Sequence, residues 1–408
     1  MMSNKTNTII LYLSSLLSVL VGVGTSVVNT RSLSIEEYGD VRYINNFLSF
    51  FASLFLFGFF VSGARLLAIT PDIQVRRRIN GAMVLVLCVA SLITMLCIVI
   101  CYYTHSLWSE GNVSVLFLYS LPICFAPLLL NYVNNTFQGE NRIINLSIAR
   151  CLPGILYLII AVVLYQYIAV TSAWMILLQN GLVLLVLLGN IIYTRPLFRQ
   201  IKETIHQLME ENKRYGLHVY VGSLFAVSFG YLAGISLGVF GENNIQVGFF
   251  MLASTISSPL AILPAITGTS YFKQFANEQR ISNRLFLFTV CISLLSLLAF
   301  VALVYPMVIF LYDHSYLDVA WIAAFLAVAT TIHGFGDMLN RFLGAHGRGK
   351  DLRNGAFACG FILLLGNVVF VYYWGINGAI ATRILSSSAY LLAMSWYYRN
   401  YTKEKIGL

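Results

Sequence analysis

Charged residues are scarce in this sequence. They account for 10% of its 408 residues, while hydrophobic residues account for 59%. Average soluble domains contain roughly 25% charged and 45–50% apolar residues. A chain with so few charges cannot give a soluble fold its polar surface, so the composition predicts a polytopic membrane protein.

Motifs for ATP hydrolysis and metal binding are lacking as well. All seven cysteines lie in apolar stretches, with no C-x-x-C pair and no clustered histidines, which argues against a disulfide framework and a zinc site. The sequence has no phosphate-binding G-x-x-x-x-G-K-S/T loop and no H-E-x-x-H pair. Its net charge of +9 is spread over short loops, whereas nucleic-acid binding needs basic residues gathered on one face. We therefore expect no metal, no bound cofactor and no nucleic acid, and any transport would draw on an H⁺ or Na⁺ gradient or on downstream consumption.

Long apolar runs fill most of the chain. A helix needs about 20 apolar residues to cross a bilayer, and the runs bounded by charged or turn residues predict twelve such helices. The predicted spans are 9–29, 41–69, 80–104, 113–137, 143–165, 169–193, 215–240, 245–272, 285–311, 318–340, 354–374 and 376–398. The fold class expected is therefore an all-α membrane protein.

The basic residues predict the orientation of these spans. When the loops alternate between the two sides, 20 of the 25 lysines and arginines fall on the side that holds both termini, and only Arg31 and Arg42 fall opposite. Positively charged loops stay in the cytoplasm, so both termini are expected there. The outer loops carry acidic residues such as Glu110 and are too short to hold a catalytic domain.

A polar stretch at residues 194–214 divides the chain into halves 1–193 and 215–408. Pro196 suits a first helical turn, and apolar residues recur after it at helical spacing beneath a charged face. They are Leu197, Ile201, Ile205, Leu208 and Met209. We expect an amphipathic helix on the inner leaflet that links two six-helix lobes; the alternative is a plain solvated linker.

A faint internal repeat supports two lobes. Phe137-Gln138-Gly139 recurs as Phe342-Leu343-Gly344, and Gly39 has a counterpart in Gly248. Both offsets are close to half the chain length. Because each half has an even number of spans, the halves are expected to be parallel repeats that face a central cleft.

Arginines inside the spans are the main candidates for a binding site. An arginine at the centre of a membrane helix costs roughly 2.5–3.5 kcal/mol on insertion scales, so it usually faces a partner or a wet cavity. Arg65, Arg150 and Arg383 lie within spans, and Arg42 lies at the start of the second span. We expect a cationic cavity. The alternatives are snorkelling to headgroups for Arg65 and structural pairing with a carbonyl or with Asp337 for the other two.

Polar residues on the same helices extend this site. Asn46, Asn131 and Asn134 are expected to line a wet interior, as are Asp337 and Arg341. Close helix packing also favours small polar residues and is the alternative for the serines and glycines nearby. Asp337 lies one turn before Arg341, so an ion pair between them is preferred to a proton site.

Two segments carry a family resemblance. Residues 31–68 contain an L-x-x-E-x-Y-G pattern at Leu33, Glu36, Tyr38 and Gly39, followed by a glycine (Gly58 or Gly63) and Arg65; residues 343–384 end with G-x-x-G-A-I-A-T from Gly375 to Thr382. Both segments resemble polysaccharide and O-antigen (Wzx-like) flippases of the multidrug/oligosaccharidyl-lipid/polysaccharide (MOP) exporter superfamily. The chain departs from many relatives at residues 230–238, where it has no acidic residue.

The resemblance implies a transporter rather than an enzyme. It implies two six-helix lobes, alternating access, and export of an undecaprenyl-pyrophosphate-linked oligosaccharide across the bacterial inner membrane. A polysaccharide polymerase and a chain-length regulator are the implied partners, beside membrane lipids.

Two alternative functions stay open. One is a cation-coupled multidrug antiporter of the same superfamily, which would need buried carboxylates. The other is a membrane polysaccharide polymerase, which would need a long outer loop or a carboxylate cluster.

Overall fold

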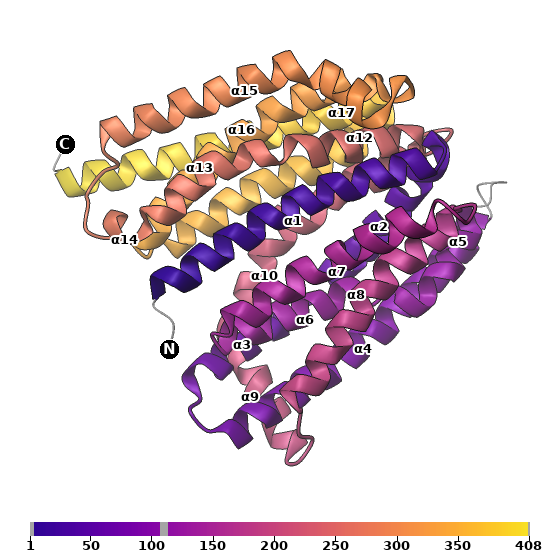
Figure 1. Cartoon of the computed structure of the whole chain (residues 1–408). Coiled ribbons are helices and arrows are strands. Elements are labelled where there is room, and N and C mark those ends of the chain that lie inside the picture. The colour runs from indigo at the N-terminus through magenta and orange to yellow at the C-terminus, as the bar shows by residue number, and fades with distance from the viewer. Residues whose placement is uncertain (1–3, 107–112, 407–408) are drawn as a thin grey trace. The chain divides into compact units, whose positions relative to one another are not determined.

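The computed structural model describes residues 4–106 and 113–406, and every regular element in these ranges is a helix (Figure 1). Nine of the described helices are long and apolar enough to cross a membrane, and one bent helix pair makes a tenth candidate. All twelve predicted spans fall on helical segments. The predicted all-α membrane fold is therefore confirmed, while Glu110 lies outside the described residues.

Contacts divide the chain into two units, Met1–Leu224 and Phe225–Leu408. The first unit contains α1 (Asn4–Ser32), α2 (Ile35–Leu54), α3 (Phe59–Ile69), α4 (Ile73–Ser106), α5 (Val113–Ser120), α6 (Ala126–Gly139), α7 (Ile143–Leu164), α8 (Ser172–Thr194), α9 (Ile201–Glu211), the π-helical turn η2 (Asn212–Gly216) and α10 (Leu217–Ser223). The second contains α11 (Phe229–Phe240), α12 (Ile245–Ser257), α13 (Pro259–Ser270), α14 (Phe272–Phe275), α15 (Asn283–Tyr312), α16 (Asp318–Ala345) and α17 (Gly349–Ile406). The linker and the start of the predicted seventh span thus pack with the first unit.

The second predicted span is broken into two helices. α2 and α3 meet at an angle of 57° across residues 55–58. The backbone φ angles of Phe57 and Gly58 at the break are +45° and +80°. The left-handed region costs glycine nothing but strains other residues. A break in the middle of an apolar run leaves backbone carbonyls without helical partners, so other groups must satisfy them.

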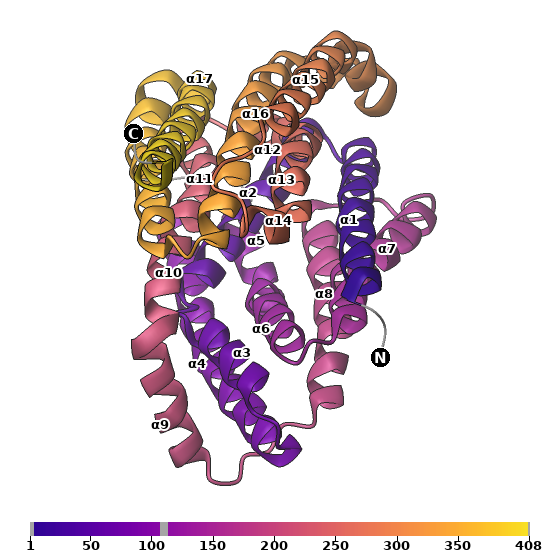
Figure 2. The ribbon, with the colours of Figure 1, turned by 90° about the vertical axis from the view of Figure 1, so that its left-hand side faces the viewer.

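The linker helix begins later than its sequence suggested. α9 starts at Ile201, so the prediction of Pro196 in its first turn is wrong. The backbone before α9 is hydrogen-bonded to another segment, because the Leu197 amide donates to the Arg77 carbonyl at 2.8 Å. The helix is amphipathic as predicted, but Thr204 and Leu208 are buried where α9 packs beside α3 and α4 (Figure 2). The buried residues of α9 therefore contact other helices of the first unit rather than the membrane surface.

Polar residues of α1, among them Ser18 and Asn29, pack against α7. Ser18 Oγ lies 3.2 Å from Cys151 Sγ, and the Tyr157 hydroxyl donates to Asn29 Oδ1 at 2.6 Å. Both contacts join α1 to α7 within the first unit. For these residues of α1, close helix packing accounts for the polar side chains.

α17 is a hairpin of two helices rather than one rod. Its backbone leaves helical geometry at Gly375, where φ is +52°. A Cβ atom built on Gly366 would lie 2.4 Å from Thr382 Oγ1, and one on Gly378 would lie 2.0 Å from the Phe370 carbonyl oxygen. Small residues thus let the two arms touch, and the arms match the predicted eleventh and twelfth spans.

An ion-pair network joins the open ends of this hairpin. Arg348 Nε lies 2.6 Å from Asp351 Oδ2, and its Nη1 lies 3.0 Å from Glu404 Oε2. The hydrogen bond to Asp351 is the main cause of a raised Arg348 pKa, with Glu404 adding to it. The guanidinium therefore stays charged and ties the first turn of α17 to its last.

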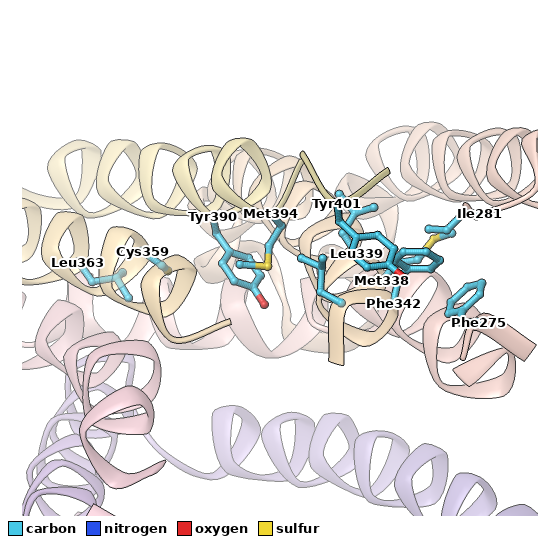
Figure 3. Packing of buried hydrophobic residues seen from close by; sticks show 11 residues of the cluster. Phe275, Ile281, Met338, Leu339, Phe342, Cys359, Leu363, Tyr390, Met394 and Tyr401 are labelled. Carbon is cyan, nitrogen blue, oxygen red and sulfur yellow. The ribbon is translucent and has the colours of Figure 1, made fainter. Parts of the chain in front are cut away.

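Aromatic and sulfur-containing side chains fill the core of the second unit at one end of α16 and α17 (Figure 3). Phe275 and Phe342 meet edge to face with ring centroids 5.4 Å apart. Met394 and Tyr390 lie side by side on α17. This packing fixes the face of α17 that carries Tyr390 against α16, which positions the polar cluster described below.

Candidate functional site

Arg150 lies on the inward side of α7. Ile148 and Ile159 mark the outer face of this helix, with exposed fractions of 51% and 58%. At 3.6 residues per turn, Arg150 is about 180–200° around the helix from both. Its neighbours on that side, Leu146 and Tyr157, are buried, yet the Arg150 side chain is itself exposed. The guanidinium therefore reaches accessible space on the side away from the outer apolar face.

A neutral partner holds Arg150. Its Nε donates to Asn134 Oδ1 of α6 at 3.0 Å. Two predicted site residues are thereby brought together. No ion pair of Arg150 occurs among the described residues, so its charge is oriented but not neutralised.

Arg65 has partners from the linker. Its Nη1 lies 2.7 Å from Glu211 Oε1, and its guanidinium carbon lies 4.8 Å from the centre of the Tyr215 ring. The Arg65 side chain remains 51% exposed. It is therefore an arginine with a resident carboxylate, and the contacts of Arg65 and Arg150 are separate.

Arg42 is positioned by its own helix. Its Nε donates to the Tyr38 hydroxyl at 2.8 Å, and its guanidinium carbon lies 5.0 Å from the centre of that ring. Asn46, which is buried, donates to the Arg42 carbonyl at 2.8 Å. Asn131 likewise donates to a carbonyl of its own helix, that of Pro127, at 3.0 Å. These two amides satisfy local backbone groups, and a lining role for them stays a prediction.

The second unit gathers a cluster of polar residues on α16 and α17. The Tyr390 hydroxyl donates to Asp337 Oδ1 at 3.1 Å. The His333 ring stacks on the Tyr390 ring with centroids 4.7 Å apart. Arg383 lies seven residues before Tyr390 on α17, so the two residues share one face of that helix. We call His333, Asp337, Arg383 and Tyr390 the α16–α17 cluster.

Arg383 lies on the inward side of α17. Leu385 and Leu392, which are 47% and 70% exposed, mark the outer face, and Arg383 is about 180–200° around the helix from both. Among the described residues its guanidinium has no ion pair within 4.0 Å. The guanidinium therefore lies on the side of its helix away from the exposed leucines, and no ion pair in the described part of the chain neutralises its charge.

Arg341 is not joined to Asp337 as the sequence suggested. No ion pair between them occurs in the described part of the chain, and Tyr390 is the hydrogen-bond partner of Asp337 instead. The stem of Arg341 packs on α13, where a Cβ on Gly268 would lie 3.1 Å from the Arg341 Cβ. Beyond this packing contact the Arg341 side chain is exposed.

Sequence patterns alone missed two members of the α16–α17 cluster. His333 precedes Asp337 by four residues and Tyr390 follows Arg383 by seven, so each pair shares one helix face. That spacing is the signal that could have found them. Glu211 and Tyr215 had no such signal, because their contact with Arg65 spans about 150 residues of sequence.

A family model described as "Polysaccharide biosynthesis protein" matches residues 5–272, well over half of the sequence. The chain belongs to the polysaccharide biosynthesis protein family. No curated protein matches it closely enough to count as a relative. The predicted family is thereby confirmed at this level.

Solved structures similar to this member of the polysaccharide biosynthesis protein family are transporters. The lipid II flippase MurJ in an inward closed conformation has a TM-score of 0.72 and 15% identity, over 96% of this chain and 87% of that one. An inward-facing multidrug resistance MATE family transporter of the MOP superfamily has a TM-score of 0.67 and 17% identity, over 96% and 95%. The MATE multidrug transporter DinF-BH gives 0.66 and 14%, over 97% and 95%. These likenesses show the fold, which is the predicted MOP fold.

The neighbours named above are themselves transporters rather than enzymes. One G-x-S-x-G match is present in this family member, at residues 234–238. In hydrolases that motif needs a sharp turn between a strand and a helix to expose its serine. Here it lies inside α11, and Ser236 is buried. The match is therefore an accident of a glycine-rich membrane helix.

Proposed function

We propose that the protein is a flippase that moves an undecaprenyl-pyrophosphate-linked oligosaccharide repeat unit across the bacterial inner membrane by alternating access. One observation carries the proposal: each unit holds an inward-facing arginine that has no ion pair within the described part of that unit. These are Arg150 in the first unit and Arg383 in the second. The family match to polysaccharide biosynthesis proteins supports the glycan as cargo.

The electrostatics favour a phosphorylated head group. A pyrophosphate that leaves water loses its hydration, and fixed cations in a low-dielectric interior replace it. Arginine suits this role because its planar fork binds phosphate oxygens in pairs and keeps its charge. Arg65 and Arg150 of the first unit are proposed to contact the head group early, and Arg383 of the second unit later. The lipid tail stays in the bilayer.

The cargo pool of a deletion strain tests this function. Without the protein, single lipid-linked repeat units are expected to accumulate on the cytoplasmic side of the inner membrane, where a reagent added outside cannot reach them. The distribution is measured by labelling the glycan with an impermeant reagent in two preparations, intact cells and inverted membrane vesicles, which expose opposite sides of the membrane. Accumulation on the outer side would indicate a polymerase instead. Extrusion of a cationic dye with an unchanged lipid-linked pool would indicate a drug exporter.

Ion coupling of the transport cycle is proposed for Asp337. Among the four members of the α16–α17 cluster, Asp337 is the only carboxylate. The hydroxyl of Tyr390, on the second arm of α17, donates to Asp337 Oδ1 at 3.1 Å. Binding of H⁺ or Na⁺ there would cancel the charge beside Arg383 and change the anion affinity of that arginine. The sequence favoured a structural ion pair with Arg341, and the Tyr390 contact is what supports the coupling role.

Asp337→Asn is the variant that checks the coupling role. In vesicles that contain the purified protein, it is expected to remove most of the stimulation that an imposed H⁺ or Na⁺ gradient gives to lipid-linked glycan translocation, a loss of about tenfold. Basal exchange without a gradient should persist. Asp318→Asn is the matched control, since Asp318 is an exposed carboxylate in the first turn of the same helix. Equal stimulation of both variants would refute the assignment.

The glycan itself is proposed to be O-antigen, capsule or a related polymer. Export of single repeat units requires a polymerase on the far side and a chain-length regulator, so these are proposed as functional partners. Glycosyltransferase genes beside the coding sequence would support this placement.

A further inference from the structure

A segment that follows the linker helix, Asn212 to Tyr220, contacts the break in the second span; we call this contact the clasp. Asn212 Nδ2 donates to the Phe57 carbonyl at 2.9 Å, and the Ser62 hydroxyl donates to Asn212 Oδ1 at 3.1 Å. The Tyr220 hydroxyl donates to the Leu54 carbonyl. Carbonyls that the break leaves without helical partners are thus satisfied by side chains that lie about 150 residues further along the sequence. All of these residues belong to the first unit.

The backbones of the two segments touch. A Cβ atom on Gly58 would lie 2.3 Å from the Gly216 carbonyl oxygen, and one on Gly216 would lie 2.5 Å from the Gly58 carbonyl oxygen. Asn212–Gly216 forms the π-helical turn η2, and such turns often occur at functional sites. The contact therefore fixes η2 and the residue before it, Glu211, relative to α3.

Arg65 lies at the end of this clasp. Its Nη1 is 2.7 Å from Glu211 Oε1, and Tyr215 covers its guanidinium at 4.8 Å. The exposed fractions of the two charged side chains are 51% for Arg65 and 15% for Glu211. An ion pair open to solvent on the arginine side is weak. A ligand of higher charge can replace the carboxylate, while the ring contact keeps the arginine in place.

We infer that Glu211 is the resident anion of Arg65, which the phosphate group of an arriving substrate displaces. This inference rests on the proposed function. It makes Glu211 a specificity-determining residue, because an anion must bind Arg65 better than a side-chain carboxylate does before it is accepted. A pyrophosphate satisfies that condition through its higher charge and its larger number of oxygens, whereas a monocarboxylate carries no more charge than the side chain that it must replace.

The chain provides a matched control one residue away. Glu210 carries the same charge on the same helix and pairs with His206 at 3.4 Å, but its side chain is 59% exposed. Neutralising Glu210 changes the local charge as much as neutralising Glu211 does, and it leaves Arg65 with its partner. A difference in probe affinity between the two variants therefore reports the contact with Arg65 and not a change in the net charge of the helix.

The test is a binding titration on the full-length protein in nanodiscs, with undecaprenyl pyrophosphate as the probe. Glu211→Gln is expected to bind the probe about three- to tenfold more tightly than wild type, and Glu210→Gln to stay within about twofold. Arg65→Ala is expected to weaken binding, and adding Glu211→Gln to Arg65→Ala should then change nothing further. Glu211→Ala is the second variant should glutamine lower the amount of folded protein.

Three results would overturn the inference. Equal or weaker binding by both Glu211 variants, with Arg65→Ala still weakened, would refute the resident anion and leave the flippase proposal intact. A gain that persists in the Arg65→Ala background would refute the contact as its cause. Absence of probe binding by wild type would remove the proposed function and the inference together.

Discussion

Replacing both Arg150 and Arg383 by alanine is expected to lower export of the lipid-linked glycan at least about 100-fold, and each single replacement about tenfold. A tenfold effect corresponds to about 1.4 kcal/mol, in the range of one lost hydrogen bond to a charged group. The two arginines belong to different units, Arg150 beside Asn134 in the first and Arg383 in the α16–α17 cluster of the second. Free energies of sites without shared partners add, so the two effects should multiply.

The measurement is surface glycan at matched amounts of membrane-inserted protein. Lysine at either position keeps the charge but loses the planar fork, so it should restore only part of the export. Arg399→Ala is the control, because Arg399 is an exposed arginine on the same hairpin as Arg383. Unchanged glycan in the double alanine variant would show that these arginines do not carry the head group.

The fold was predictable because it follows from local properties of the chain. A run of about 20 apolar residues is enough to define a span, and each of the twelve runs lies on one or more helices in the structure. The inward position of Arg150 was predictable for a related reason. The cost of an arginine in lipid makes an inward orientation the expected one, and the exposed Ile148 and Ile159 on the opposite face show that orientation.

Long-range contacts were not predictable from the sequence. Phe57 lies in a continuous apolar run, and its positive φ depends on support from Asn212, a residue that reads as part of a polar linker. Pro196 fits a first helical turn by local rules, but the Leu197 backbone is held by Arg77 and the helix starts later. In both cases a partner far away in the sequence overrides the local preference.

The same distinction explains the outcome for Asp337. Its spacing to Arg341 suits an ion pair along one helix, and that pair is what the sequence favours. In the structure Asp337 instead accepts a hydrogen bond from Tyr390 on the neighbouring arm. The interaction that decides its environment is therefore tertiary, and only the folding of α17 at Gly375 brings Tyr390 into place.

The hairpin of α17 gives the second large effect, which is on stability. Gly378→Ala is expected to lower the free energy of unfolding by about 1–3 kcal/mol or more, the usual cost of overpacking, because the added Cβ would lie 2.0 Å from the Phe370 carbonyl oxygen. A backbone oxygen cannot rotate away as a side chain can, so the two arms must separate. Arg383 and Tyr390 lie on the second arm, and the α16–α17 cluster would be displaced with it.

Gly230→Ala is the matched control and should have the opposite sign. Gly230 lies within α11 of the same unit, and a Cβ there would meet no atom within 4 Å. Alanine in an open helical position raises stability by about 0.5–1 kcal/mol over glycine. Thermal unfolding midpoints of the two purified variants in one detergent provide the comparison. If both glycines respond alike, close contact between the arms of α17 does not contribute to the stability of the fold.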